Sequence, residues 1–130
     1  MDIQGNIGRE VSAGCTRGEY YFAEGCFITE LHNTENDAAV SVARARVEPG
    51  RTTRWHSLEG IYERYLIIAG CGQVEIGNEP PRAVGPCDAV LIPAGCRQRI
   101  TNTSTVDLVF LAVCTPRFVV SAYRDLAEDP

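Results

Sequence analysis

The chain has 130 residues, of which 45% are hydrophobic, and it carries a formal net charge of −5 at pH 7. This length corresponds to one domain with its own core, and the acidic balance argues against nucleic acid as a partner. All basic residues are arginine, which excludes Schiff-base and P-loop lysine chemistry. We expect a cytoplasmic protein without membrane contact, because no apolar run reaches about 18 residues and 1–10 has no secretory signal.

Short runs rich in Val, Ile, Tyr and Phe alternate with glycine and proline along the chain. The first half predicts strands at 27–31, 39–47, 52–58 and 63–69. The second half predicts strands at 73–76, 88–92, 96–101 and 108–114, and a final strand or docked turn within 117–126. So many short antiparallel strands indicate an all-β jelly-roll barrel that forms a single domain over 1–130.

A set of regularly spaced residues begins at Gly50. Five residues follow it before His56, Leu58 comes two positions later, and Glu63 and Gly70 follow after intervals of four and six residues. This spacing resembles the first motif of the cupin family, over residues 50–70. In that motif two histidines and a glutamate bind a metal ion. The resemblance places Leu58 where the family has its second histidine.

A second set of residues resembles the second cupin motif, over residues 87–102. Cys87 takes the place of the first glycine, and Pro93 and Gly95 match the family pattern. Gln98 stands where the family has its fourth metal ligand, a histidine, and Asn102 closes the motif. Two motifs in the right order support the cupin fold, although two of the four metal ligands differ.

The resemblance implies a divalent metal ion on His56, Glu63 and Gln98, acting as a Lewis acid or activating a water molecule. One nitrogen and two oxygen donors favour Mn²⁺ or Fe²⁺, while Zn²⁺ and Ni²⁺ also fit. An amide oxygen is a weak ligand, so the sequence leaves open that the site holds no metal.

Alternation along strands sends every second side chain to the same face. Applied to both motifs, it predicts that the barrel interior is lined by Arg54, His56, Leu58, Glu63, Tyr65, Cys96 and Gln98. Among these, Glu63 and Tyr65 are the candidate catalytic residues. Arg54, Leu58 and Cys96 are the candidate ligand-binding residues, with Arg54 as the anchor for an anionic group.

Two metal-free alternatives remain. In the first, Gln98 hydrogen-bonds Glu63 or His56 and Arg54 pairs with Glu63, which leaves an inert barrel or a pocket for an organic ligand. In the second, Glu63 is a base with a raised pKa, and His56 or Tyr65 is the acid of an isomerase. The sequence therefore leaves open whether the chain is an enzyme.

The partner expected from the sequence is a small polar or anionic metabolite bound inside the barrel, either as a substrate or as the ligand of a binding module. The resemblance also implies a homodimer, because small cupins commonly pair through sheet edges. The six cysteines include no C-x-x-C pair, so we expect buried free thiols rather than a thiolate metal site.

Overall fold

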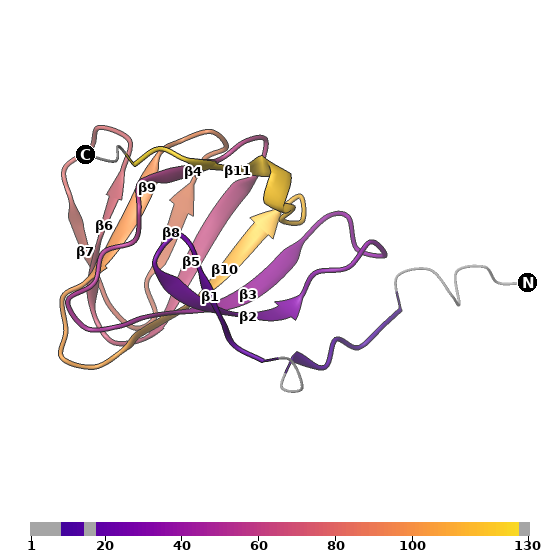
Figure 1. Ribbon diagram of the computed structural model, residues 1–130, viewed down its shortest axis with the longest axis horizontal. Coiled ribbons are helices and arrows are strands. Elements are labelled where there is room, and N and C mark those ends of the chain that lie inside the picture. Colours follow the sequence, from indigo (N-terminus) through magenta and orange to yellow (C-terminus); the bar gives the residue numbers. More distant parts are fainter. Residues whose placement is uncertain (1–8, 15–17, 128–130) are drawn as a thin grey trace, which may run out of the picture.

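The computed structural model describes residues 9–14 and 18–127, and in these the chain folds into two facing antiparallel sheets (Figure 1). The six-stranded sheet runs, in spatial order, β1 (Tyr20–Phe22), β2 (Cys26–His32), β3 (Ser41–Val47), β10 (Leu108–Thr115), β5 (Tyr62–Ala69) and β8 (Ala89–Ile92). The five-stranded sheet runs β11 (Tyr123–Asp125), β4 (His56–Leu58), β9 (Gln98–Asn102), β6 (Gly72–Ile76) and β7 (Arg82–Val84). This arrangement confirms the predicted all-β jelly roll.

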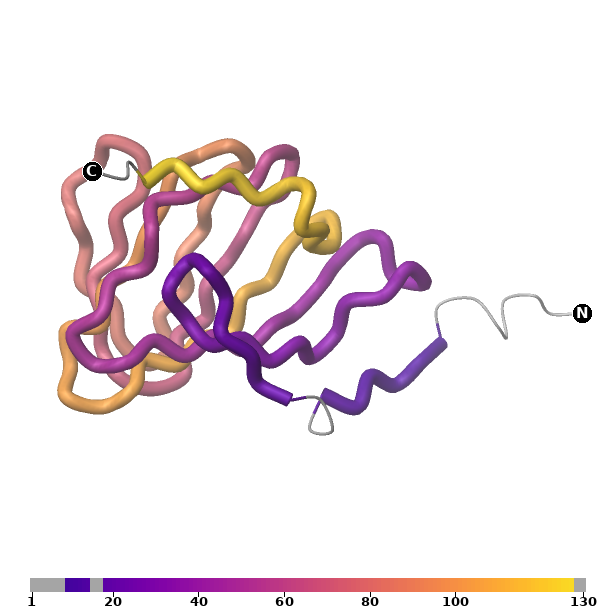
Figure 2. The backbone as a smooth tube through the Cα atoms, viewed as in Figure 1, coloured from indigo at the N-terminus to yellow at the C-terminus, as the bar shows by residue number. Residues whose placement is uncertain are grey.

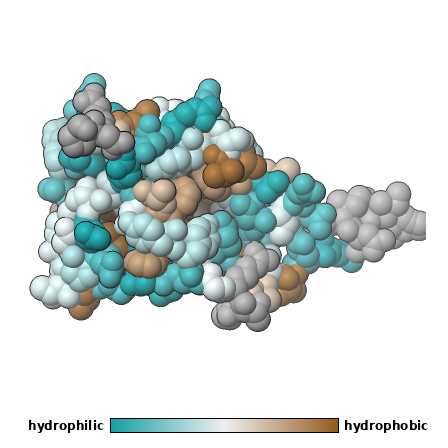
Figure 3. All heavy atoms as spheres, viewed as in Figure 1, coloured by the Kyte–Doolittle hydropathy of each residue, from teal (hydrophilic) through white to brown (hydrophobic). Residues whose placement is uncertain are grey.

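The core lies between the two sheets and follows the alternation of each strand. On β5, Glu63, Tyr65 and Ile67 are buried, whereas Leu66 and Ile68 face outward. On β10 the inward residues are Leu108, Phe110, Ala112 and Cys114. Burial of these apolar side chains is the main favourable term in the stability of the barrel. On the face seen in Figure 3, hydrophilic and hydrophobic residues are interspersed.

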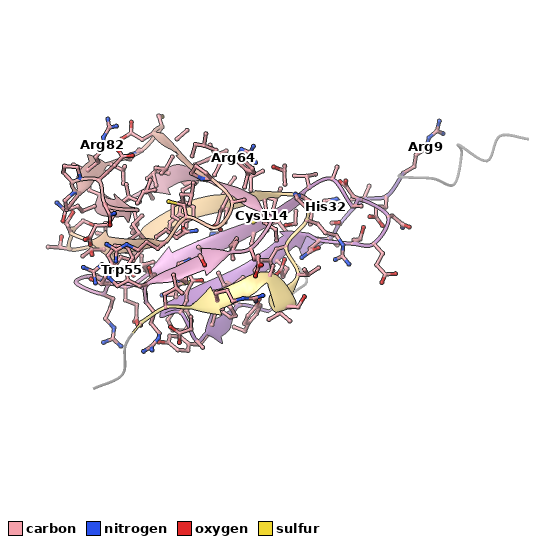
Figure 4. The ribbon with its side chains drawn as sticks, turned by 90° about the horizontal axis from the view of Figure 1, so that it is seen from above. Arg9, His32, Trp55, Arg64, Arg82 and Cys114 are labelled. Atoms are coloured by element: carbon pink, nitrogen blue, oxygen red, sulfur yellow. The ribbon has the colours of Figure 1, made fainter. Side chains whose placement is uncertain are left out.

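Trp55, directly before β4, packs outside the barrel. The guanidinium carbons of Arg97 and Arg99 lie 4.0 Å and 4.4 Å from the centre of its indole ring. Cys114, by contrast, comes from β10 of the opposite sheet and is buried between the sheets (Figure 4). Trp55 thus lies outside the barrel while its neighbour His56 is buried.

Each predicted strand overlaps an observed one, but the strands predicted at 52–58 and 96–101 begin only at His56 and Gln98, and two strands were missed. The missed strands, β1 and β7, have three residues each and lie at sheet edges. Pro80 and Pro81 precede β7 and are typical of a loop, so no strand was predicted there. Segment 117–126 contains a short 3-10 helix, η3 (Val120–Ala122), followed by β11, which pairs with β4.

The motif glycines occupy turns that need left-handed backbone conformations. Gly50, Gly70 and Gly95 have φ values of 74°, 79° and 75°. Cys87, which replaces a motif glycine, also has a positive φ of 75°. A side chain in this region is strained, so glycine at this motif position has a conformational explanation.

Asn102 connects three parts of the chain at the end of β9. Its amide donates hydrogen bonds of 2.8 Å to the carbonyls of Val47 and Val106. Its side-chain oxygen accepts hydrogen bonds of 2.8 Å from the backbone amide and the hydroxyl of Ser104. The fully buried amide is therefore satisfied on both ends, as a buried polar group must be.

The cysteines are free wherever the structure describes them, but the expectation that they are buried is wrong for part of the set. Cys26 and Cys114 are buried, whereas Cys71 and Cys87 are exposed and Cys96 is half-buried. Cys71 and Cys87 are exposed because they lie in turns at the ends of strands. Within residues 9–14 and 18–127, no helix is long and apolar enough to cross a membrane.

Candidate functional site

A small cavity of about 60 Å³ opens between the two sheets, close to the first cupin motif. The hairpin that joins β1 to β2 forms part of its wall and appears as a dark indigo loop in front of the sheets in Figure 2. The backbone amide of Arg54 donates a 2.7 Å hydrogen bond to the carbonyl of Glu24, which holds the hairpin against the segment before β4. The described lining residues are Tyr20, Phe22, Glu24, Ile28, Glu30, Ser41, Ala43, His56, Leu58, Glu63, Ala112, Cys114 and Phe118.

His56 lies on β4 with a fixed orientation. Its Nδ1 donates a 2.7 Å hydrogen bond to the backbone carbonyl of Arg54, so Nδ1 carries the proton of the neutral ring and Nε2 has a free lone pair. The ring stacks on Tyr123, with centroids 5.3 Å apart and planes 19° from parallel. Burial lowers the pKa of His56, which favours the neutral imidazole.

Glu63 is part of a buried chain of hydrogen bonds. Gln98 Nε2 donates to Glu63 Oε1 over 2.8 Å, and Gln98 Oε1 accepts a hydrogen bond from the Tyr65 hydroxyl. The thiol of Cys114 lies 3.9 Å from Glu63 Oε2 and donates to it. Burial, reinforced by the nearby Glu24, raises the pKa of Glu63 to about 7, despite the opposing effect of these hydrogen bonds and of His56.

Glu24 is the site residue that the sequence did not reveal. Its carboxyl oxygen lies 3.7 Å from His56 Nε2, and its side chain is 13% exposed. Burial raises the pKa of Glu24 to about 7, although a hydrogen bond with Cys26 lowers it. Glu24 lies in a hairpin outside both motifs, and nothing in its sequence neighbourhood marks it as functional. Only the tertiary contact with His56 identifies it.

Tyr123 was also missed, because the tail was predicted only as a strand or turn. It lies on β11, and its ring contacts Phe22 in an edge-to-face arrangement with centroids 5.1 Å apart. Its buried hydroxyl makes no hydrogen bond with any residue in the described part of the chain. Through these two ring contacts, Tyr123 links the β1–β2 hairpin to His56.

The structure brings some of the predicted wall residues together. His56, Leu58 and Glu63 line the cavity as predicted. Gln98 pairs directly with His56 across β4 and β9 and contacts Glu63, as one metal-free alternative predicted. Tyr65 is fully buried behind Gln98 and is not part of the described cavity wall.

The predicted placement of Arg54 and Cys96 on the same wall is wrong. The Nε of Arg54 donates to both carboxyl oxygens of Asp125, over 3.2 Å and 3.1 Å, and the expected pair with Glu63 does not form. Cys96 lines a separate opening bordered by β6, β7 and β8. Strand β4 begins at His56 and β9 at Gln98, so the alternation of side chains does not extend back to Arg54 or Cys96.

The metal ion that the cupin resemblance implies needs donor atoms that are free to coordinate it. Both ends of the Gln98 amide are already engaged, with Glu63 and Tyr65, and the adjacent ligand position is the apolar Leu58. In the part of the chain that the structure describes, no three His, Cys, Asp or Glu side chains come together as metal ligands. As arranged, these residues do not fit a metal ion held by His56, Glu63 and Gln98.

Comparison with known proteins identifies the family. A family model described as a cupin domain matches residues 43–114. An oxalate-binding protein from Thermotoga maritima is 33% identical over 98 residues, which cover 75% of this chain and 76% of the relative. Among solved structures, a Streptomyces nucleoside dehydratase has a TM-score of 0.77 at 16% identity, covering 94% of both chains. A predicted oxalate decarboxylase from Thermotoga maritima has a TM-score of 0.72 at 24% identity, covering 82% of this chain and 99% of the other. The chain belongs to the cupin family.

Proposed function

We propose that this cupin binds a small molecule in the cavity and catalyses proton transfer on it without a metal ion. The observation that carries the proposal is the contact of His56 Nε2 with Glu24 at 3.7 Å, in a buried cavity that Glu63 also lines. A general base and a general acid within reach of one ligand are the requirement for isomerase or lyase chemistry. The activity of the nucleoside dehydratase is compatible with such chemistry in this barrel, but that likeness concerns the fold alone.

In this proposal the three groups have distinct roles. The lone pair on His56 Nε2 accepts a proton from the ligand, while Nδ1 stays bonded to the Arg54 carbonyl. Glu63, with a pKa of about 7, is partly protonated at neutral pH and delivers a proton to the ligand. Glu24 faces Nε2 and takes up the proton from the imidazolium, which restores the neutral ring. After the product leaves, Glu24 releases this proton to solvent and Glu63 takes one up, which restores the starting state. Tyr65 and Gln98 act as positioning residues, because they hold Glu63 and do not line the cavity.

A metabolite screen followed by hydrogen exchange tests this function. Compounds that raise the thermal stability of the chelator-treated protein are incubated with it in D₂O, and deuterium incorporation into each is measured by mass spectrometry. We expect exchange at one position of at least one bound compound. His56→Gln should lower the exchange rate about 100-fold or more, because it removes the base.

The matched control is His32→Gln, which changes the chain's other histidine. His32 contacts Ser12 and Asp37 outside the cavity, so the exchange rate should not change. If compounds bind but none exchanges hydrogen, the protein is a binding module and the catalytic proposal is contradicted. Exchange that appears only after Mn²⁺, Fe²⁺, Ni²⁺ or Zn²⁺ is added would contradict the metal-free mechanism.

A metal-dependent function of His56, Glu63 and Gln98 stays a prediction from the family resemblance. Leu58 and Gln98 are both buried beside His56, so the double change of Leu58→His with Gln98→His restores the family's donor set. We expect this variant to bind Ni²⁺ or Zn²⁺ at least about 100-fold more tightly than wild type, measured by calorimetric titration. A metal that co-purifies with the wild type at one equivalent would contradict the metal-free site.

A further inference from the structure

The charge of the cavity is unusual for a member of a family with an oxalate-binding relative. Two carboxyl groups lie near His56 in its wall, those of Glu24 and Glu63, and the described part of the wall contains no arginine. His56 presents its Nε2 as a further hydrogen-bond acceptor, because its Nδ1 donates to the Arg54 carbonyl. Around His56 the described wall therefore supplies hydrogen-bond acceptors, and no cationic side chain among the described lining residues faces an anionic ligand.

The aromatic part of the wall is suited to the same kind of ligand. Tyr20, Phe22 and Phe118 line the cavity together with the carboxyl groups. The hydroxyl of Tyr20 donates to Glu30 over 3.5 Å, so the ring and the carboxyl lie at the same part of the wall. Aromatic faces attract organic cations through their negative π surface, and carboxylates accept hydrogen bonds from ammonium groups.

An anionic ligand would meet a different environment. A carboxylate that enters the cavity loses its hydration and lies close to Glu24 and Glu63, and above the pKa of about 7 of these two carboxyls the resulting repulsion opposes binding. The anchor expected for an anion, Arg54, instead pairs with Asp125. Oxalate, the ligand in the name of the Thermotoga relative, carries two negative charges and matches this wall poorly.

We infer that the cavity selects its ligand by charge and takes a small protonated amine, with the ammonium group between Glu24 and Glu63 and the carbon skeleton against the aromatic rings. This inference deepens the proposed function, because it names the ligand class of the same site. It assigns Glu24 and Glu63 a role in ligand specificity in addition to proton transfer.

Four probes of similar size and different charge test the inference: ethylammonium, propanamide, propionate and oxalate. Each is titrated into the ¹⁵N-labelled full chain at pH 7.5, and binding is followed by the NMR shifts of Ala112 and the His56 ring, both in the cavity wall. We expect ethylammonium to bind most tightly. Glu24→Gln and Glu63→Gln should each weaken it about tenfold, the effect of losing one hydrogen bond to a charged group.

Glu48→Gln is the matched control, since Glu48 is an exposed glutamate in the turn after β3, outside the described cavity wall. It should leave the affinity for ethylammonium unchanged. Propionate or oxalate binding at Ala112 and His56 as tightly as ethylammonium would overturn the inference, as would the absence of any shift with ethylammonium.

The two proposals fail in different ways. If anions bind and His56-dependent deuterium exchange is observed, the inference of an amine ligand is wrong but the proposed catalytic function is not contradicted. Ethylammonium binding without exchange on any amine would remove the catalytic role and leave the ligand class in place. Spectra of Glu24→Gln and Glu63→Gln that keep the wild-type dispersion show that a lost affinity does not come from unfolding.

Discussion

At the scale of single residues, Glu24 and Glu63 make the stability of the barrel depend on pH. Burial raises the pKa of both carboxyls from 4.5 to about 7. Between these values the folded protein keeps protons that the unfolded chain has released, so the free energy of unfolding falls as pH rises from 4.5 to 7. Above pH 7, one such group lowers the free energy of unfolding by about 3 kcal/mol relative to its value below pH 4.5. The lowered pKa of His56 has the opposite effect, because it lowers the free energy of unfolding below pH 6.5, where the unfolded chain binds a proton that the folded protein does not.

Glu63→Gln should remove much of this pH dependence. The glutamine oxygen can still accept the hydrogen bond from Gln98, but the side chain no longer ionises. At pH 8 we expect the variant to be more stable than wild type by up to about 3 kcal/mol, with little difference at pH 5. Urea unfolding at pH 5, 6.5 and 8 measures this, with Glu48→Gln as the control on an exposed carboxyl. Parallel pH profiles for Glu63→Gln and wild type would show that Glu63 does not titrate as described.

At the scale of elements, the turns between strands explain much of the motif spacing. Gly70 has a φ of 79°, and a Cβ at this position would lie 2.6 Å from the Asp107 carbonyl. Glycine is therefore required there for both conformation and space. Cys87 has the same kind of backbone conformation but carries a side chain. It is a local conflict between sequence and structure, in the turn before β8.

Cys87→Gly should relieve this strain. The left-handed conformation costs a residue with a side chain about 1–2 kcal/mol, of which the greater freedom of glycine in the unfolded chain offsets a part. We expect the variant to be more stable than wild type by about 1 kcal/mol in urea unfolding. Cys71→Gly is the control, because Cys71 is equally exposed but has no positive φ, and it should be neutral or destabilising. A loss of stability in Cys87→Gly would contradict the assigned strain.

At the scale of the whole molecule, the outer face of the six-stranded sheet is rich in apolar residues. Leu66, Ile68 and Leu91 are 38%, 53% and 55% exposed, on neighbouring strands β5 and β8. Leu111 on β10 pairs with Leu66 and extends the apolar area across the sheet. A sheet face of this kind is suited to pack against a second copy of itself about a twofold axis. The homodimer expected from the family resemblance would then form through this sheet face and not through the sheet edges.

We therefore predict a homodimer that Ile68→Glu converts to a monomer, because the change places a charge on the apolar face. Sedimentation velocity at about 10–100 μM measures the mass of both proteins, a range in which weak dimers dissociate detectably. Val106→Glu is the control, since Val106 is 59% exposed in the turn between β9 and β10, away from this face. A dimer that survives Ile68→Glu would point to the sheet edges instead.

Much of the fold and part of the site could be predicted from the sequence. The motif spacing placed His56, Glu63 and Gln98 together because each lies on a strand, and His56 and Gln98 pair directly across β4 and β9. The errors at Arg54 and Cys96 have one physical cause. Side-chain alternation holds only within a strand, and both residues lie in segments that precede one.

The sequence by itself determined the all-β barrel, the cupin family and the strands that carry His56, Glu63 and Gln98, because periodicity and turn residues are local properties of the chain. Only the tertiary structure decided the chemistry of the cavity. Glu24 is remote in sequence from His56, and its 3.7 Å contact exists because the β1–β2 hairpin folds back onto the segment before β4. The same folding buries Glu24 and Glu63 together, and burial rather than residue type raises their pKa values.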